Sequence, residues 1–449
     1  MTRAMAHYLP REMAVLGLVE LTLSFAVIYA VIEMAGAAVP LPAVADVLPR
    51  GGVALAATLA LVIGGVALII GLYRPEVCLD RTRLLIAVSL AAIISFGVLF
   101  VLDGGPRFGL GRDSAMRVSQ AVAGWFGVMT LIRLAYGFAI SRRPLARRVL
   151  LLGDTVQVGA LRARLRYGHG SLFDPVVPQS RTVAWQQLRQ QGIWGVVVAS
   201  EPDGAAAEGL LDCKLRGMRI FSGTAFHENY LGRIDLDALT ANHLLLGRNL
   251  AAGRISALVK RLCDIVVGVL MLVLLLPVMA LTALAVKIES PGPVFYRQRR
   301  VGQFDTTFTL FKFRSMTADA EASGNPRWAQ KQDPRITRVG RFIRATRIDE
   351  LPQLANVIRG EMSMVGPRPE RPHFVEQLAR AIPFYRQRGY VKPGLTGWAQ
   401  VNFPYGASVE DAREKLAYDL YYVKNRTILL DVIILLSTVR VVLFREGAR

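Results

Sequence analysis

The chain has 449 residues, of which 53% are hydrophobic, and it carries 54 Lys and Arg against 34 Asp and Glu, a formal net charge of +20. Its length predicts two or three domains, and a mean hydropathy of +0.36 with 20% charged residues excludes a disordered or fibrous chain. The positive charge leaves nucleic acid, anionic lipid and phosphorylated substrates as partners. The cysteines, Cys78, Cys213 and Cys263, lie far apart, which excludes a disulfide framework or a zinc finger and fits a reducing compartment.

Four apolar windows are each long enough to cross a hydrocarbon core of about 30 Å as a helix. They lie near residues 13–35, 51–73, 84–102 and 119–140. They predict four transmembrane helices over residues 1–145. Glu20 and Glu33 lie in the first window and Arg133 in the fourth, so we expect these helices to bury polar side chains against one another. A cleaved signal peptide is not expected, because the first window is too long and three more windows follow it.

Basic residues in the loops predict the orientation of these helices. The loop at 36–50 has one basic residue, Arg50, whereas the loop at 74–83 and the exit from the fourth helix carry several. These are Arg74, Arg81, Arg83, Arg142, Arg143, Arg147 and Arg148. The positive-inside rule therefore places both termini in the cytoplasm, although three arginines in the 103–118 loop weaken the contrast.

Residues 146–250 have the composition of a soluble α/β domain. The predicted elements are buried strands at 149–153, 195–199 and 218–221 and a helix at 156–166. Strands that alternate with helices indicate a small parallel, Rossmann-like sheet. Its first turn has Gly153 and Gly159, not the GxGxxG loop that lets a backbone approach a pyrophosphate. A structural or regulatory module is therefore favoured over a dinucleotide site.

A fifth apolar stretch, at 262–286, has Pro277 near its middle, where proline removes a backbone hydrogen bond and kinks a helix. If this stretch crossed the membrane, the basic remainder of the chain after Lys287 would be external, against the positive-inside rule. We therefore expect a re-entrant helix hairpin that bends at Pro277. The alternative is an ordinary kinked transmembrane helix.

Five arginines recur at every third position with apolar side chains between them. They are Arg335, Arg338, Arg341, Arg344 and Arg347. On a helix this spacing gives a basic face beside an apolar one, which is typical of an element in the lipid headgroup plane; a solvated charged face is the alternative. Aromatic platforms and a known reader motif are missing from this stretch, so we do not expect nucleic acid as a partner.

Asp349 and Glu350 follow directly, at a predicted helix start. One carboxylate of such a pair can attack while its neighbour holds a divalent cation, and Mg²⁺ suits hard oxygen ligands that also carry a substrate's phosphates. An isolated pair of this kind is usually a solvated helix cap. Here the rigid turn at 366–369 presents Arg368 between Pro367 and Pro369. Further phosphate ligands are offered by Lys312, Arg314 and Arg347.

Six motifs, in the same order within residues 290–402, resemble those of the bacterial sugar transferases. They lie at 290–296, 299–302, 312–316, 349–354, 364–369 and 392–402. This family comprises the polyprenyl-phosphate hexose-1-phosphate transferases, or monotopic phosphoglycosyl transferases, that begin exopolysaccharide and O-antigen assembly. The four helices and the Rossmann-like segment resemble the large form of the family. Residues 403–407 depart from the commoner pattern and are similar to the exopolysaccharide subgroup associated with PEP-CTERM protein sorting.

The resemblance implies a mostly α-helical catalytic domain over 251–449, at the cytoplasmic face of the bacterial inner membrane. It implies transfer of a hexose-1-phosphate from a UDP-sugar to polyprenyl (undecaprenyl) phosphate, with release of UMP. Asp349 is then the nucleophile that forms a covalent sugar phosphate, and Glu350 ligates Mg²⁺. A homodimer is allowed by resemblance only.

The resemblance also implies roles for other residues of the motifs. Arg368 in its Pro-Arg-Pro turn would hold the nucleotide, and the three cations named with it, Lys312, Arg314 and Arg347, would contact phosphates. Asp419 matches a further acidic position of the family. The motifs do not encode which sugar is transferred.

A last apolar stretch runs from 428 to 444. Thr427, Asp431 and Thr438 fall on one helical stripe, which predicts an amphipathic helix packed on the domain and on the membrane surface. A transmembrane helix is the alternative.

Two other functions stay open. A membrane-bound nucleotide-sugar epimerase or dehydratase would use the middle segment, but it needs a complete dinucleotide loop and a Tyr-x-x-x-Lys pair, and neither occurs between 148 and 250. A non-enzymatic scaffold for polysaccharide export leaves the Asp349-Glu350 pair and the Pro-Arg-Pro turn without a role.

Overall fold

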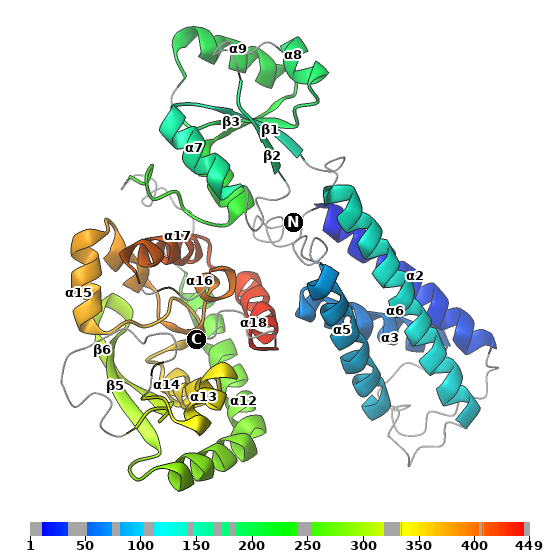
Figure 1. Ribbon diagram of the computed structural model, residues 1–449, viewed down its shortest axis with the longest axis vertical. Helices are drawn as coiled ribbons and strands as arrows, with labels where there is room; N and C mark the ends of the chain where they lie inside the picture. Colours follow the sequence, from blue (N-terminus) through cyan, green and yellow to red (C-terminus); the bar gives the residue numbers. More distant parts are fainter. Residues whose placement is uncertain are drawn as a thin grey trace. The chain divides into compact units, whose positions relative to one another are not determined.

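Figure 1 shows the fold, a computed structural model. It describes residues 11–34, 52–73, 81–102, 112–141, 147–165, 173–178, 185–200, 202–240, 253–317, 333, 335–403, 406 and 408–443. Outside the described residues lie Cys78 and most of the loops behind the orientation argument, at 36–50, 74–80, 103–111 and 142–146. The chain divides into two compact units, Met1–Leu231 and Gly232–Arg449. The second unit thus begins before the domain boundary predicted at 250.

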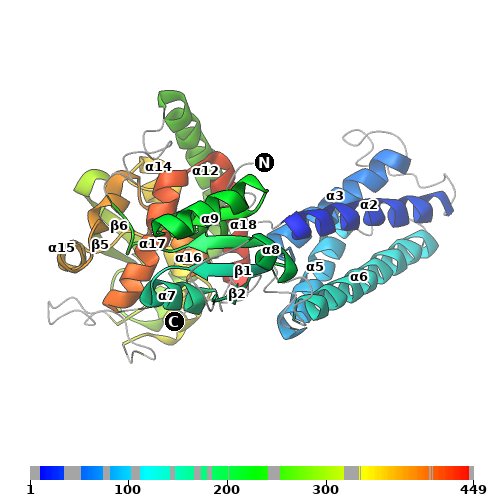
Figure 2. The ribbon, with the colours of Figure 1, turned by 90° about the horizontal axis from the view of Figure 1, so that it is seen from above.

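The first unit starts with four long helices that coincide with the predicted apolar windows. They are α2 (Arg11–Met34), α3 (Gly52–Ile70), α5 (Arg81–Leu102) and α6 (Arg112–Ser141). Helices α2 and α5 each pack against α3 and α6 (Figure 2). The expected polar burial is confirmed at Glu20 and Arg133, whose Oε2 and Nη2 atoms are 2.6 Å apart and whose side chains are 2% and 0% exposed. Glu33 is exposed. That these four helices cross a membrane stays a prediction.

The first unit continues with a parallel sheet, which confirms the predicted sheet. Its strands, in the order β2-β1-β3-β4, are β1 (Arg147–Leu152), β2 (Phe173–Val176), β3 (Gly195–Val198) and β4 (Arg219–Ser222). Strand β2 was missed because Asp174 and Pro175 interrupt its apolar pattern.

Helices cover both faces of this sheet. Helix α7 (Thr155–Arg164) packs on one face, and α8 (Trp185–Gln190) and α9 (Gly204–Leu215) pack on the other. Successive side chains of a strand point to opposite sides, so Val149 and Leu151 of β1 face one layer and Leu150 and Leu152 face the other. Both faces of β1 are therefore apolar. The short helix α10 (Gly223–Phe226) and a single π-helical turn, η3 (His227–Leu231), end the unit.

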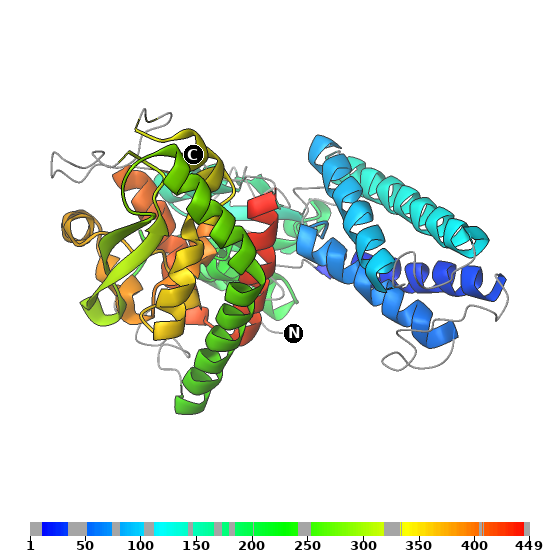
Figure 3. The same ribbon diagram turned by 90° about the horizontal axis from the view of Figure 1, so that it is seen from below.

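The second unit contains α12 (Arg254–Glu289), a helix of 36 residues that includes the predicted fifth apolar stretch. Among the residues that the structure describes, it is the one helix long and apolar enough to cross a membrane. Its apolar side chains face outward, with Val273 and Leu274 67% and 72% exposed, whereas the polar Asp264 is buried. Figures 1 and 3 show α12 bent, as expected for a helix that contains Pro277. Its re-entrant course through a membrane stays a prediction.

The remainder of the second unit is a set of short elements. Strands β5 (Phe295–Val301) and β6 (Thr307–Phe313) are antiparallel, and β7 (Ser363–Val365) and β8 (Gly394–Thr396) are parallel. The helical elements are η4 (Gln303–Asp305), α13 (Arg338–Ala345), η5 (Ile348–Gln353), α14 (Leu354–Arg359), α15 (Pro372–Ala381), η6 (Tyr385–Tyr390), α16 (Trp398–Asn402), α17 (Val409–Asn425) and α18 (Ile428–Leu443).

Helix α18 is the predicted C-terminal amphipathic helix, and its packing on the domain is confirmed. It contacts α16, β7 and β8, and the Oγ1 atoms of Thr438 and Thr396 are 2.6 Å apart. It also lies beside α12 in Figures 1 and 3. Lys260 Nζ of α12 is 2.8 Å from Asp431 Oδ2 of α18. Contact of α18 with a membrane surface stays a prediction.

The five arginines do not share one helix. Helix α13 holds only the middle three, because it begins after Thr337, whose hydroxyl accepts the Gly340 N–H at 2.9 Å. It ends before Arg347, which has a left-handed φ of 59°. The chain therefore turns sharply between α13 and η5, and this turn sets the direction of the carboxylate pair that follows.

Candidate active site

Asp349 and Glu350 lie in the first turn of η5, directly after the left-handed Arg347. Both are buried, with 6% and 7% of their surfaces exposed. Helix η5 packs against β6, which carries Lys312, and against α13. The pair therefore sits at a junction of short elements and is not a solvated helix cap.

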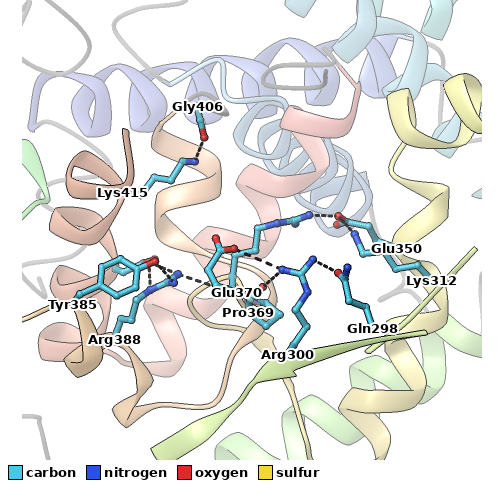
Figure 4. Close-up of polar contacts among 12 residues, drawn as sticks. Gln298, Arg300, Lys312, Glu350, Pro369, Glu370, Tyr385, Arg388, Gly406 and Lys415 are labelled. Carbon is cyan, nitrogen blue, oxygen red and sulfur yellow. Dashed lines mark hydrogen bonds and ion pairs between the residues drawn. The ribbon is translucent and has the colours of Figure 1, made fainter. Parts of the chain in front are cut away.

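Glu350 is surrounded by cations (Figure 4). Its Oε1 atom lies 2.7 Å from Arg368 Nη2, 3.0 Å from Lys312 Nζ and 3.7 Å from Arg347 Nη1. Burial by itself raises the pKa of Glu350, but these three cations outweigh burial and hold the pKa well below its ordinary value. Glu350 is therefore a permanent negative charge at neutral pH.

Asp349 has a different environment. Its Oδ2 atom is 4.0 Å from Lys312 Nζ, and its buried Oδ1 atom accepts no hydrogen bond from the residues that the structure describes. Burial raises the pKa of Asp349; Lys312 opposes that rise, and the neighbouring Glu350 charge adds to it. An oxygen with unused lone pairs and raised basicity is what a carboxylate nucleophile requires.

Both carboxylates line a cavity of about 430 Å³, a volume that suits a small-molecule substrate. Within the described part of the chain, Lys and Arg outnumber Asp and Glu on its walls. The cations are Arg300, Lys312, Arg314, Arg335, Arg344, Arg347, Arg368, Arg371, Arg388 and Lys415, and the acids are Asp349, Glu350, Glu370 and Asp419. Such walls favour a ligand with several negative charges, such as a diphosphate.

The turn that presents Arg368 is held through the carbonyl groups on each side of that arginine. Arg300 Nη1 donates to the Pro369 carbonyl at 2.9 Å, and the Gly394 N–H donates to the Pro367 carbonyl at 2.9 Å. Figure 4 shows Arg300 reaching from β5 toward Pro369 and Gln298. With its backbone fixed, the Arg368 guanidinium reaches Glu350.

Asp419 lines the cavity from α17, but its carboxylate is paired. Its Oδ2 atom is 2.8 Å from Arg388 Nη2, which also donates to the Arg368 carbonyl at 2.9 Å. Burial raises the pKa of Asp419, and Arg388 opposes the rise. The direct contact of Asp419 is thus with Arg388, and any contact with substrate stays a prediction.

Arg314 also lines the cavity, yet its donors point at the backbone. Its Nη1 atom donates to the Pro291 carbonyl at 2.7 Å, and its Nη2 atom to the Ser290 carbonyl at 2.8 Å. Arg314 therefore holds the chain just after α12. Its predicted contact with phosphate stays untested.

The structure brings together most of the residues predicted for the site: Lys312, Arg347, Asp349, Glu350 and Arg368. Sequence reasoning missed Arg388 and Lys415, which line the same cavity from η6 and α17. No local sequence pattern marks either residue as part of the site, because only the tertiary fold brings η6 and α17 to the carboxylates. Arg300 lies in a recognised motif and was a detectable candidate. Pro277 belongs to α12 and is not among the residues that line the cavity.

The carboxylate pair has the oxygen ligands that a magnesium ion takes, and Mg²⁺ at this site stays a prediction. Within the described residues, no three His, Cys, Asp or Glu side chains cluster as a metal site. Mg²⁺, however, is usually bound by one or two carboxylates together with substrate phosphates. Asp349 Oδ1, which accepts no hydrogen bond from a described residue, and the ionised Glu350 beside it provide such hard oxygen donors.

Comparison with known proteins places this geometry in context. Residues 255–445 match the sequence model of the bacterial sugar transferase family. The UDP-N-acetylgalactosamine-undecaprenyl-phosphate N-acetylgalactosaminephosphotransferase of Aeromonas hydrophila is 44% identical over 240 residues, which are 54% of this chain and 56% of that protein. The UDP-glucose:undecaprenyl-phosphate glucose-1-phosphate transferase of Caulobacter vibrioides is 42% identical over 191 residues, 42% of this chain and 71% of that protein.

A putative undecaprenyl-phosphate N-acetylgalactosaminyl 1-phosphate transferase of Bacillus subtilis is 54% identical over 130 residues, 29% of this chain and 72% of that protein. The undecaprenyl-phosphate glucose phosphotransferase of Komagataeibacter xylinus is matched over only 36% of its length. The chain thus spans about a third to a half of the length of several relatives. The residues that match the family model, 255–445, lie in the second unit and include the cavity and the carboxylate pair. On this similarity, the chain belongs to the bacterial sugar transferase family.

Proposed function

We propose that the protein transfers a hexose-1-phosphate from a UDP-sugar to undecaprenyl phosphate, releases UMP, and thereby initiates exopolysaccharide synthesis. The observation that carries the proposal is the unequal environment of the two buried carboxylates. Glu350 is neutralised by three cations, while Asp349 keeps an oxygen that accepts no hydrogen bond from a described residue. Two of the relatives are named for UDP-N-acetylgalactosamine and for UDP-glucose, which supports a UDP-sugar as the donor.

The reaction proceeds in two displacements at phosphorus. An oxygen of Asp349 attacks the β-phosphorus of the UDP-sugar, the bond from that phosphorus to the oxygen bridging the phosphates breaks, and UMP leaves with the electron pair. An oxygen of undecaprenyl phosphate then attacks the same phosphorus, and the bond to Asp349 breaks. The carboxylate is regenerated, and the lipid diphosphate sugar departs.

The cations of the cavity supply the stabilisation that this reaction needs. Phosphoryl transfer depends mostly on positioning and on neutralising charge at the transferred and leaving oxygens. Arg368, Lys312 and Arg347 surround the pair and can contact both phosphates of the donor. A bound Mg²⁺ would supply further charge neutralisation on the diphosphate, and Glu350 would hold it.

The acceptor has a headgroup at the bilayer surface and a tail in the hydrocarbon. Helix α12 presents exposed apolar side chains along its length, and its buried residues are Asp264, Gly268, Thr282 and Val286. This supports a catalytic unit anchored in the inner membrane, with the cavity on the cytoplasmic face where UDP-sugars are available. A re-entrant course of α12 would keep the whole unit on that face.

Release of UMP tests the proposal. Membranes that contain the protein are incubated with UDP-glucose or UDP-N-acetylgalactosamine and undecaprenyl phosphate, and UMP is measured. The Asp349→Asn protein should lose at least about a thousandfold in rate while remaining folded. Undiminished UMP release by that variant would remove Asp349 from the nucleophile role, and no release by the wild type with either donor would count against these donors.

A further inference from the structure

The segment 232–240, here called the strap, lies upstream of the family match at 255–445 but belongs to the same compact unit. It follows Leu231 directly and runs without helix or strand. A segment of this kind is ordinarily a linker with few contacts. The strap instead makes several specific contacts with α16 and α17, which are two walls of the cavity.

The backbone of the strap is hydrogen-bonded to both helices. The Ile234 N–H donates to the Ala417 carbonyl of α17 at 3.0 Å, and Trp398 Nε1 of α16 donates to the Gly232 carbonyl at 2.7 Å. Ile234 and Trp398 are 3% and 1% exposed. Backbone groups buried in this way hold the strap at one register along α17.

Arg233 is a buried cation that the proposed chemistry does not use. It is 7% exposed, forms an ion pair with Glu414 and stacks on the Tyr418 ring at 5.4 Å from its centroid. Burial lowers the pKa of Arg233, but Glu414 and Tyr418 outweigh burial and raise it, so the guanidinium stays charged. Glu414 is 34% exposed, so removing Glu414 leaves the buried Arg233 without this ion pair, whereas removing Arg233 breaks the link between the strap and α17.

Two adjacent faces of α17 have different neighbours. The strap contacts Glu414, Ala417 and Tyr418, whereas Lys415 and Asp419 line the cavity. Residues one position apart on a helix lie about 100° apart around its axis, so the two faces belong to the same turns of α17. A displacement of α17 at the strap therefore moves its cavity face as well.

From Asp419 a chain of polar contacts leads to the carboxylate pair. Asp419 pairs with Arg388 at 2.8 Å, Arg388 donates to the Arg368 carbonyl at 2.9 Å, and Arg368 donates to Glu350 at 2.7 Å. A displacement of α17 therefore reaches the residues that are to hold the donor phosphates.

We propose that the strap is a working part of the catalytic unit and that Arg233 is a positioning residue, which holds α17 so that Lys415 and Asp419 stand correctly at the donor cavity. For its kinetic test the inference rests on the proposed function. It extends that function to a residue outside the recognised family region.

The kinetic test compares KM and kcat for the UDP-sugar that supports UMP release by the full-length wild type. We expect Arg233→Ala to raise KM about fivefold and to change kcat per folded enzyme by less than about twofold. Loss of folded protein alone would lower the maximal rate in proportion and leave KM unchanged. Glu414→Gln should raise KM similarly, and the double variant should add little, because both changes remove the same pair.

A matched control is Arg216→Ala, which removes an arginine from an exposed ion pair with Asp212 in α9. It should leave KM at the wild-type value. If Arg233→Ala does not fold, Arg233→Lys retains the charge without the planar stack on Tyr418 and should show a smaller rise in KM. A wild-type KM in every folded Arg233 and Glu414 variant, or an equal rise in the control, would overturn the positioning role.

Hydrogen exchange of the α17 amides tests the strap independently of catalysis. In Arg233→Ala these amides should exchange faster than in wild type, while those of the sheet β1–β4 should not change. Equal exchange in α17 would overturn the inference even if the enzyme is active. Faster exchange together with no UMP release by the wild type would instead leave the strap intact and refute the proposed donors.

Discussion

The side chain of Arg314 lies at the cavity wall but donates its hydrogen bonds to backbone carbonyls. Its guanidinium donates to the Ser290 and Pro291 carbonyls and lies 3.4 Å from that of Val286. These oxygens belong to the last turn of α12 and the segment after it. The fork of Arg314 therefore joins the end of the apolar helix to β6, where its neighbour Lys312 contacts the carboxylate pair.

We expect Arg314→Lys to lower Tm by about 4 to 8 °C, because a lysine cannot serve several carbonyls at once. KM for the UDP-sugar should stay near the wild-type value. Thermal unfolding followed by UMP assays on the folded variant checks both quantities. An unchanged Tm with a KM raised severalfold would show instead that Arg314 binds phosphate, as the family resemblance implies.

The two carboxylates themselves were predictable, because Asp349 and Glu350 are adjacent in a recognisable motif. Their unequal environments were not. Arg368 and Lys312 come from other elements, and their distances to Glu350 depend on the turn at Arg347 and on the packing of η5 against β6. No local pattern encodes which of two neighbouring acids receives the cations.

At the level of elements, Glu289 links the end of α12 to the start of α13. Both of its carboxylate oxygens accept the Val339 N–H at 3.1 Å, in the first turn of α13. Burial raises the pKa of Glu289, but hydrogen bonds from Thr337 and from the Val339 and Arg338 amides together outweigh it, so the pKa lies below its ordinary value of 4.5. A carboxylate at a helix N-terminus is stabilised by these amides.

The sign of the pH dependence follows from this lowered pKa. The folded state holds the ionised form, so the stabilisation is present above pH 4.5 and is lost as the pH falls through the lower folded value. Glu289→Gln should therefore lower Tm by about 1 to 2 °C at neutral pH, and this difference should vanish in acid. Tm measured as a function of pH for both proteins checks this, and a difference that persists in acid would exclude the charged cap.

Helix α12 gives a prediction about topology. In a background without cysteine, Glu410→Cys places one thiol on an exposed position of α17. We expect no labelling of intact cells by a membrane-impermeant maleimide, because a helix bent at Pro277 returns the catalytic unit to the cytoplasmic side. Replacing Pro277 with Leu should straighten the helix and increase labelling from outside. Labelling of Glu410→Cys in the protein that retains Pro277 would show that α12 crosses the membrane.

At the scale of the whole molecule, the two units carry different chemistry. The sheet of the first unit has Gly153 at the end of β1 with a φ of 145°, in close contact with Ala199 and Ser200. A Cβ at this position would lie 3.0 Å from the Ser200 nitrogen. The glycine is therefore required by the packing of the turn against its own chain, and it does not imply an open cradle for pyrophosphate.

We accordingly expect the protein not to bind NAD. Addition of about 1 mM NAD should leave Tm unchanged, since a ligand that binds only the folded state stabilises it by RT ln(1 + L/Kd), where L is the free ligand concentration, and so raises Tm. A rise of several degrees would return the nucleotide-sugar epimerase or dehydratase to consideration. UDP-glucose serves as the comparison ligand, because it should stabilise the second unit.

The sequence by itself determined the apolar helices, the parallel sheet and the identity of the carboxylate pair, because each depends on local periodicity or on a contiguous motif. It also predicted that polar side chains are buried between the apolar helices, which holds for Glu20 and Arg133, but it did not predict that these two pair with each other. It could not determine the end of α13, which depends on a left-handed residue at Arg347.

Only the tertiary structure decided which cations meet Glu350, that Asp349 keeps an oxygen without a hydrogen-bond donor among the described residues, and that the strap braces α17. These features join residues far apart in the chain, such as Arg233 with Glu414 and Lys312 with Glu350. The physical reason is that electrostatic and packing energies depend on distances in space, which sequence spacing sets only within a helix, a strand or a turn.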